Sequence, residues 1–425
     1  MEFGNRCNAS YFDNRLSAEV LEILNGLQFQ NEEERSFIER VFRFMKLSRF
    51  DARDFSSTLA WVLKVLPSRL LPSAWGGIIP AVTIAGRHQR INEYIANNPW
   101  YSLGAHPHLL DLGCGFPPIT TIELSSRFPN ARVTGADPAF ASEIVYDAEG
   151  NYACFDSHQE LPRYFQLATG DAKRWQEMFA DMEATKTAFA ELRKYLHSKE
   201  TTDDPRGRFI LNPMREYETE RRSFRQAGFL EFEMRDLDVI RSFNVLLYYT
   251  AAYRQKVLEW IPSMLQDGGL FICGTDWHLS TQARYTVYQK ERSVLHEREF
   301  AFSVDNIRPL GIVSWFALHD DEPDTLRMCE LVGQLRSNPM FCVAYDQRLD
   351  ELLLQYELIR RNSEGYAEVI DPLLPPLESQ RRLQEIFETL EKEEFAARAV
   401  SVLRANGVNA SVNSVGHIAV SAGKV

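Results

Sequence analysis

The stretch LLDLGCGFPP at residues 109–118 and the stretch RVTGADPAF at residues 132–140 decide the fold. Each contains a short apolar run that reaches an acidic residue, Asp111 or Asp137, and a Gly-x-Gly turn with a helical pattern lies between the two runs. Two β-strands whose carboxyl ends each deliver a carboxylate to one cleft would give this pattern. Open α/β sheets hold adenosine-containing cofactors in this way. The sequence therefore predicts an α/β fold with a doubly wound, Rossmann-like sheet.

Composition and charge narrow the class of protein. The chain has 425 residues, which leaves room for two or three domains, and 45% of them are apolar, as in ordinary globular proteins. The formal net charge is −12 and the pI is about 5.4, so the electropositive surface of a nucleic-acid binder is not expected. No run approaches 18 apolar residues and the first residues are polar, which predicts no membrane span and no signal peptide.

The cysteines are dispersed along the chain, without a Cys-x-x-Cys pair and without Cys/His spacing suited to a metal. No metal site is therefore expected, and buried free thiols in a reducing, cytoplasmic compartment are the natural interpretation. The residues concerned are Cys7, Cys114, Cys154, Cys273, Cys329 and Cys342.

Hydrophobic spacing divides the chain into three predicted regions: a helical N-terminal region at 1–100, a central α/β domain at 101–320 and a C-terminal α+β extension at 321–425. Residues 173–230 break the βα alternation of the central domain and are predicted to be a helical insertion that acts as a lid. The helices expected outside the central domain lie at 32–50, 56–72, 84–98, 350–361 and 379–404, and a short hairpin ends the chain.

Within the central domain the alternation of short apolar runs and amphipathic stretches predicts strands and helices in the βα order of an open sheet. A final pair of runs, near 299–304 and 312–318, is expected to pair antiparallel and close the sheet. The other predicted strands lie at 108–112, 131–137, 163–169, 237–249 and 268–277, with helices at 118–128 and 251–265.

The turn after the first strand has the residues of a ligand-binding loop. Gly113 and Gly115 lack a Cβ, so the backbone can turn tightly and approach a ligand, with Cys114 between them. Asp111 either orients this loop or accepts a hydrogen bond from a cofactor. A dinucleotide site would place a third glycine where this chain has Pro118, which argues against NAD or FAD.

Acidic residues follow two further predicted strands. Asp137 lies 22 residues beyond Gly115, well placed to accept ribose hydroxyls, although an Asp before Pro138 is also a common start of a helix. Asp171 follows the strand predicted at 163–169, where it would meet the adenine amino group or cap the next helix. The residue types alone leave both alternatives open.

The last candidates follow the later strands. Asn244 ends the strand within 237–249 and could hold a substrate group with its side-chain amide. His278 follows the strand at 268–277 and is the candidate general base, because histidine titrates near neutral pH; a structural histidine is the alternative. Arg87 and His88 precede the first strand, where they could clamp the carboxylate of a cofactor or form a solvated helix face.

These motifs resemble those of class I S-adenosylmethionine-dependent methyltransferases, in order and over about half of the chain. Residues 238–274 are similar to chemotaxis-receptor glutamate methyltransferases, although Phe243 stands where those enzymes have an arginine. The segments 116–124 and 240–246 look closer to uncharacterised bacterial methyltransferases. The motifs that carry the resemblance are DLGCG (111–115), GADP (135–138), GDA (170–172), FNVLLYY (243–249) and LQDGGLFICG (265–274).

The resemblance implies S-adenosylmethionine as the cofactor and methyl transfer to an O, N or C nucleophile of a small molecule or peptide. It implies His278 and Asn244 as catalytic residues. A non-catalytic regulator or partner protein that binds S-adenosylmethionine or S-adenosylhomocysteine is the alternative. The helix at 379–404 could mediate dimerisation, which gives that alternative weight and makes a homodimer possible. The implied cofactor-binding residues are Arg87, Asp111, Gly113, Cys114, Gly115, Asp137, Pro138, Asp171 and Asn244.

Overall fold

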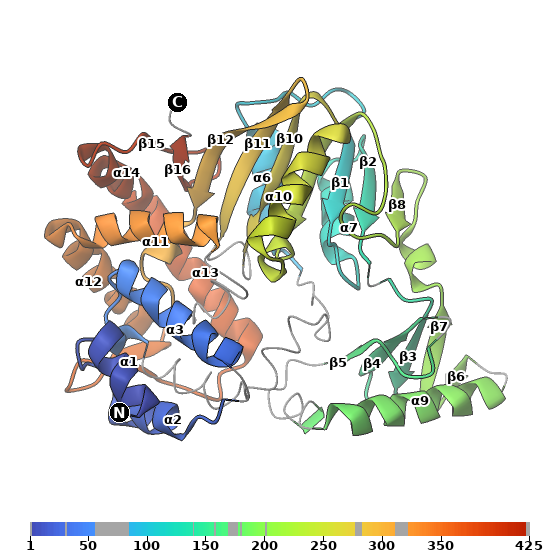
Figure 1. Ribbon diagram of the computed structural model, residues 1–425, viewed down its shortest axis with the longest axis horizontal. Helices are drawn as coiled ribbons and strands as arrows, with labels where there is room; N and C mark the ends of the chain where they lie inside the picture. Colours follow the sequence, from blue (N-terminus) through green and yellow to red (C-terminus); the bar gives the residue numbers. More distant parts are fainter. Residues whose placement is uncertain are drawn as a thin grey trace. The chain divides into compact units, whose positions relative to one another are not determined.

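The protein forms two compact units, each of which mixes helices and strands (Figure 1). Within the described residues, the first unit holds 2–55, 85–109 and 233–421, and the second holds 110–232. This confirms the predicted α/β class, while the division at residues 100 and 320 stays a prediction. The computed structural model describes residues 2–29, 32–55, 85–138, 140–156, 159–168, 177–178, 181–199, 202–276, 283–310 and 322–421.

The first unit is built around two parallel strands, β9 (Leu237–Phe243) and β10 (Leu265–Thr275). They are joined by helix α10 (Ala251–Trp260). Every residue of β9 is buried, as expected for a central strand, although Asp238, Arg241 and Ser242 are polar or charged. Gly274 lets the neighbouring strand approach closely, because a Cβ there would lie 2.1 Å from the carbonyl oxygen of Arg284. The two strands and the helix predicted here are thus confirmed, but the strand predicted at 237–249 ends at Phe243 and the helix predicted at 251–265 ends at Trp260.

Antiparallel strands continue this sheet in the order β15-β16-β12-β11-β10-β9. The predicted run at 299–304 falls at the end of β12 (Val294–Phe302), but its partner is β11 (Arg284–Glu291), which the sequence pattern did not reveal. The run at 312–318 lies outside the described residues. The predicted terminal hairpin is confirmed as β15 (Ala410–Val412) and β16 (Ile418–Ser421), and β16 pairs with β12.

The N-terminal helices belong to the same unit. Helix α3 (Glu32–Leu47) buries one apolar face and packs against α11 (Pro323–Arg336). The contact is close at Gly333, where a Cβ would lie 2.4 Å from the carbonyl oxygen of Leu47. Helical character is therefore confirmed for this region, except at 56–72, which lies outside the described residues. The remaining elements are α1 (Phe3–Tyr11), α2 (Ala18–Gly26), η1 (Ala52–Asp54) and α6 (Gln89–Asn97).

The C-terminal helices correct two predictions. The helix predicted at 350–361 ends at Gln355, as the last turn of α12 (Pro339–Gln355), and a short hairpin follows it. The helix predicted at 379–404 is two helices, because Glu394 takes a left-handed φ of 60° and reverses the chain. The face that suggested a homodimer packs inside this unit. The elements are β13 (Ile359–Arg361), β14 (Ala367–Val369), α13 (Pro376–Lys392) and α14 (Phe395–Ala405), and the buried side chains are Ile386, Leu390, Val400 and Leu403.

The second unit contains β1 (His108–Leu112), α7 (Ile119–Arg127) and β2 (Arg132–Ala136), close to their predicted bounds. The strand beside β2 is β8 (Arg222–Arg225), and the pair is parallel. Gly135 makes room for this pairing, because a Cβ there would lie 2.8 Å from the ring of Phe224. The division between the units falls within β1.

The insertion differs from the helical lid predicted at 173–230. The strand expected near 163–169 is β5, at the edge of a separate antiparallel sheet in the order β5-β4-β3-β7-β6, on which α9 packs. The prediction failed because the charged run before Phe224 has too few apolar residues to mark a strand. The elements are β3 (Glu143–Asp147), β4 (Tyr152–Phe155), β5 (Tyr164–Gln166), α9 (Met182–Ser198), β6 (Asp203–Asp204), β7 (Gly207–Leu211) and η2 (Pro213–Tyr217).

The described residues give no sign of a membrane span or of a metal cluster. Among them, no helix combines the length and the apolar character that crossing a membrane requires. Over the same residues, no group of three or more His, Cys, Asp or Glu side chains is arranged to hold a metal ion.

Candidate functional site

The Gly-x-Gly turn in the second unit has the backbone that its glycines predict. Gly113 and Gly115 have φ of 78° and 66°, a left-handed region in which a Cβ would be strained. The Gly113 N–H donates to the Ala136 carbonyl oxygen at 2.7 Å, so the turn after β1 is joined to the end of β2. The loop therefore lies at the edge where both strands end, and it presents backbone rather than side chains.

Asp137 is part of the same construction. Its Oδ2 accepts a hydrogen bond from the Gly115 N–H at 2.9 Å, and the residue is 6% exposed. A buried carboxylate is costly unless it accepts hydrogen bonds, so this contact holds both the turn and the carboxylate in place. The neighbouring Pro138 carbonyl accepts from Arg163 Nη1 at 2.8 Å, which anchors the chain after β2.

Asp111 orients the loop rather than standing open to a ligand. Its Oδ2 accepts from the hydroxyls of Thr120 and Thr121 at 3.0 and 2.8 Å, which ties the end of β1 to the first turn of α7. The hydrogen bonds thus favour the first of its two predicted roles. Burial raises the pKa of the Cys114 thiol, with the charges of Asp137 and Asp111 adding to the effect, so Cys114 is a neutral packing group.

The predicted adenine-side residue needs a correction of its context. Asp171 lies outside the described residues, and the strand before it, β5, belongs to the antiparallel sheet of the insertion. The strand beside β2 is β8, and the Asp137 N–H donates to the Arg225 carbonyl oxygen at 3.2 Å. Gln226, exposed and next along the chain, therefore follows the strand that the sequence reasoning assigned to Asp171. Phe224, between polar residues, is the signal in the sequence of this strand.

In the first unit, Asp276 is the centre of a polar cluster. It follows β10, its side chain is 0% exposed, and its Oδ2 lies 2.6 Å from Nδ1 of His88. Its Oδ1 accepts from Nδ2 of Asn244 at 2.9 Å and lies 3.9 Å from Nε of Arg87. The cluster brings together three of the residues singled out in the sequence. Asp276, directly after β10, is their common partner.

Asn244 and Asp276 bind one another twice. Besides the contact of its Nδ2, the Oδ1 of Asn244 accepts from the Asp276 N–H at 3.1 Å, and its own N–H donates to the Gly274 carbonyl oxygen. Asn244 has a left-handed φ of 59°, which asparagine tolerates better than most residues. The side chain predicted to hold substrate therefore joins the ends of β9 and β10 and leaves one amide N–H of Nδ2 for other contacts.

His88 is held in one orientation by this cluster. Its ring packs against Phe243, with ring centroids 5.2 Å apart, and the residue is 5% exposed. An aspartate at Nδ1 fixes which imidazole nitrogen faces outward, as in the Ser-His-Asp arrangement. Sequence reasoning missed the pair because its members are 188 residues apart. His278 lies outside the described residues.

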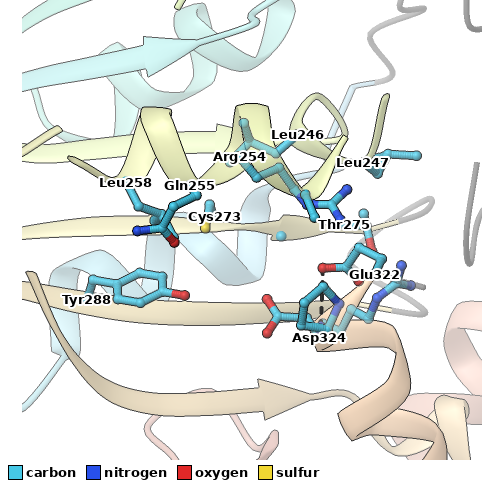
Figure 2. Close-up of a pocket in the computed structure, with 14 residues that line it drawn as sticks. Leu246, Leu247, Arg254, Gln255, Leu258, Cys273, Thr275, Tyr288, Glu322 and Asp324 are labelled. Carbon is cyan, nitrogen blue, oxygen red and sulfur yellow. Dashed lines mark hydrogen bonds between the residues drawn. The ribbon is translucent and has the colours of Figure 1, made fainter. Parts of the chain in front are cut away.

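A pocket of about 150 Å³ lies between α10 and α11 in the same unit (Figure 2). Leu246, which follows β9, and Thr275, which ends β10 beside Asp276, contribute to its wall, so it lies at the carboxyl edge of both strands. Asp324, at the start of α11, also faces it. Burial, together with the charge of Glu322, raises the pKa of Asp324 to about 7. No sequence motif pointed to Asp324.

Methyltransferases are among the solved structures that this chain resembles. No model of a protein family and no curated protein matches the chain. The mitomycin 7-O-methyltransferase is 12% identical, with 58% of this chain and 49% of that chain covered and a TM-score of 0.23. Human N-acetylserotonin methyltransferase, in complex with SAM, is 13% identical, with coverages of 64% and 46% and a TM-score of 0.20.

Phosphoethanolamine N-methyltransferase 1 of Haemonchus contortus, in complex with phosphoethanolamine and S-adenosylhomocysteine, is 13% identical. The match covers 84% of this chain and 44% of that chain, with a TM-score of 0.23. The chain thus spans about half the length of these structures or less. Since the TM-scores are this low, the functional interpretation rests on the residues of the chain itself.

Proposed function

We propose that this chain is an S-adenosylmethionine-dependent methyltransferase that acts on an O, N or C nucleophile of a small molecule or peptide. The observation that carries the proposal is the hydrogen bond from the Gly115 N–H to the Asp137 carboxylate. It combines, at one strand edge, a glycine turn that ligand atoms can approach and an acidic residue suited to a ribose. A cytoplasmic location and a homodimer remain part of the proposal. The apolar face of α13 and α14 does not support the homodimer, because it is buried inside the first unit.

The residues of the loop fit the cofactor by their chemistry. Gly113 and Gly115 leave the space of two Cβ atoms open, and the carboxylate of Asp137 accepts hydroxyl donors such as those of a ribose. Asp111 holds the loop through Thr120 and Thr121. When bound, S-adenosylmethionine supplies a methyl group on a positively charged sulfur.

In the first unit, the cluster around Asp276 is suited to accepting a proton from the nucleophile. Asp276 fixes the imidazole of His88 through Nδ1, so that Nε2 is the nitrogen left to accept a proton from a nucleophile. Asn244 is a positioning residue, because both of its amide atoms hold the end of β10. His278 remains the base predicted from sequence, which gives two histidines to compare by substitution.

Calorimetric titration of the purified chain with S-adenosylmethionine, S-adenosylhomocysteine and NADH tests the cofactor. We expect both sulfur compounds to bind and NADH not to bind. Asp137→Ala should weaken binding by about 1–3 kcal/mol, because charge-assisted hydrogen bonds are lost. Glu160→Ala, at an exposed acidic residue of the same unit, is the matched control and should bind as the unmodified chain does. Equal affinity for the Asp137 and Glu160 variants would remove the ribose assignment.

Turnover separates the enzyme from a regulator that only binds the cofactor. His88→Gln and His278→Gln should leave the affinity for S-adenosylhomocysteine unchanged, and the variant that removes the base should lower the rate of methyl transfer. A chain that binds both sulfur compounds but transfers no methyl group to any acceptor in a broad panel of amines, phenols and peptides would support the regulatory alternative.

A further inference from the structure

The pocket between α10 and α11 has hydrogen-bonding oxygens that the protein leaves unused. The Oγ1 of Thr275 is buried, and the residue as a whole is 9% exposed. No described residue forms a hydrogen bond with this oxygen. Thr286 donates to Oδ2 of Asp324 at 2.8 Å, and no hydrogen bond reaches Oδ1 from any described residue. A buried hydroxyl and a carboxylate oxygen that accept no hydrogen bond cost free energy. A ligand that donates hydrogen bonds to both would remove that cost.

A third oxygen comes from the opposite wall. Figure 2 shows the hydroxyl of Tyr288 and the carboxylate of Asp324 pointing toward one another across the pocket. Burial raises the pKa of Tyr288, with nearby acidic groups adding to the effect, so its hydroxyl stays protonated and its oxygen can accept a hydrogen bond. Thr275, Asp324 and Tyr288 therefore each contribute an acceptor oxygen to the lining of the pocket, Asp324 from the start of α11 and the other two from the neighbouring strands β10 and β11.

The other charged residues of the pocket are engaged in the fold. Glu322 caps α11: its Oε1 accepts from the Asp324 N–H at 3.2 Å and its Oε2 accepts from the Thr325 N–H at 2.7 Å. Arg284 donates to Thr325 Oγ1 at 3.0 Å, and Arg254 donates to the Tyr249 carbonyl at 2.5 Å. Neither guanidinium is thus left over to attract an anion, whereas Asp324 keeps one carboxylate oxygen for a ligand.

We propose that this pocket binds a small ligand through a protonated primary amine, with the ammonium on Asp324, Thr275 and Tyr288 and a short apolar arm along the leucines of α10 and the segment before it. A primary ammonium has three N–H donors, which match the three oxygens. The apolar wall consists of Leu246, Leu247 and Leu258. The pocket has a volume of about 150 Å³, and butylamine, with five non-hydrogen atoms, supplies both an ammonium and a short apolar arm.

This assignment names the acceptor class of the proposed methyltransferase, and in that respect it rests on the proposed function. The pocket adjoins the Asp276 cluster through Thr275, at the ends of β9 and β10, where open α/β sheets bind ligands. An amine must lose its proton before it can attack a methyl group. The proton would pass from the ammonium nitrogen to Asp324, which leaves the nitrogen lone pair as the nucleophile and a neutral carboxyl group on the protein.

Binding without any cofactor tests the pocket, so its failure is distinct from a failure of the proposed function. Ligand-observed NMR would follow butylamine, 1-butanol and butyrate, three probes of similar size that differ in charge. We expect butylamine to bind at least tenfold more tightly than either of the others. Equal binding of 1-butanol, or tighter binding of butyrate, would overturn the proposal, whatever the titration with S-adenosylmethionine gives.

Substitutions locate the binding. Asp324→Asn keeps the size of the side chain and should weaken butylamine binding at least tenfold, whereas Thr275→Val and Tyr288→Phe should each weaken it threefold to tenfold. Glu330→Gln, at an exposed acidic residue on the same helix, is the matched control and should leave the affinity unchanged. Full affinity in the Asp324→Asn variant, with fold verified by circular dichroism, would refute the assignment.

The pH dependence gives a second test. Burial and the charges of Glu322 and Glu297 raise the pKa of Asp324, while the hydrogen bond from Thr286 and the charge of Arg284 oppose them. The carboxylate is therefore ionised at pH 8 and largely protonated at pH 6. Butylamine stays protonated throughout, so its affinity should fall several-fold from pH 8 to pH 6. An affinity independent of pH would contradict a charged contact with Asp324.

Discussion

His417 should make the first unit sensitive to acid. It precedes β16, is 1% exposed, and its Nδ1 lies 3.3 Å from the Tyr285 hydroxyl. Burial, with a contribution from the charge of Arg90, lowers the pKa of His417 from 6.5 to about 3. Between these values the unfolded chain takes up a proton that the folded chain excludes, so stability is full above pH 6.5 and is lost as the pH falls toward 3. At pH 5 the loss amounts to about 2 kcal/mol.

Urea denaturation at pH 7 and pH 5, followed by tryptophan fluorescence, measures this loss. In His417→Gln the free energy of unfolding should change between the two pH values by about 2 kcal/mol less than in the unmodified chain, because the titrating group is gone. His106→Gln, at an exposed histidine of the same unit, is the control and should behave as the unmodified chain does. A His417 variant that loses as much stability as the control on acidification would refute the reasoning.

Three further substitutions test packing and backbone. Asp276→Asn replaces the buried carboxylate that contacts His88 and Asn244 and should cost about 1.5–3 kcal/mol in the free energy of unfolding, measured by urea denaturation; a change below 1 kcal/mol would contradict its central place. Gly135→Ala forces a Cβ against the Phe224 ring and should cost about 1–3 kcal/mol, seen as a lower midpoint of thermal unfolding; an unchanged midpoint would mean that β8 shifts freely. Glu394→Gly relieves a left-handed φ and should stabilise the first unit by about 0.5–1 kcal/mol in the same urea experiment; destabilisation would show that the side chain contributes more than the backbone costs.

The sequence predicts the strands that are buried and bounded by clear turns. Residues 108–112 and 237–243 are short segments rich in Leu, Val, Ile and Phe next to a glycine turn or a helical stretch, and the structure places β1 and β9 there. The loop around Gly113 is also predictable, since only a glycine avoids strain at its backbone angles. These features are local, and local pattern is what a single sequence reveals.

Other features depend on contacts between distant segments. β8 is read as part of a helical insertion because its residues are charged, and only Phe224, packed at Gly135, marks it as the neighbour of β2. The strand near residue 164 is real, but its partner is β4 rather than β2. The segment Arg284–Glu291 has half-buried polar residues that hide the strand pattern.

The candidate site shows the same limit. Asp137 and Gly115 lie 22 residues apart and their relation follows from the motif spacing, whereas His88 and Asp276 lie 188 residues apart. No local pattern joins that second pair. Asp324 is predictable only as the start of a helix, because its raised pKa depends on Glu322, Glu297 and the walls of the pocket.

The order of the two units along the chain has a consequence during protein synthesis. Within the described residues, the second unit falls in the stretch 110–232, whereas the first unit draws on segments before and after that stretch. Helix α3 is synthesised before its partner α11, whose first residue is Pro323. At ~5–20 residues per second the delay between the two helices is roughly 15–55 s. Throughout that interval the apolar face of α3, including Phe37 and Phe44, has no native partner on α11. The face of α3 that packs against α11 therefore stays uncovered by α11 during synthesis, and a chaperone that binds apolar segments would act there, before β16 is made.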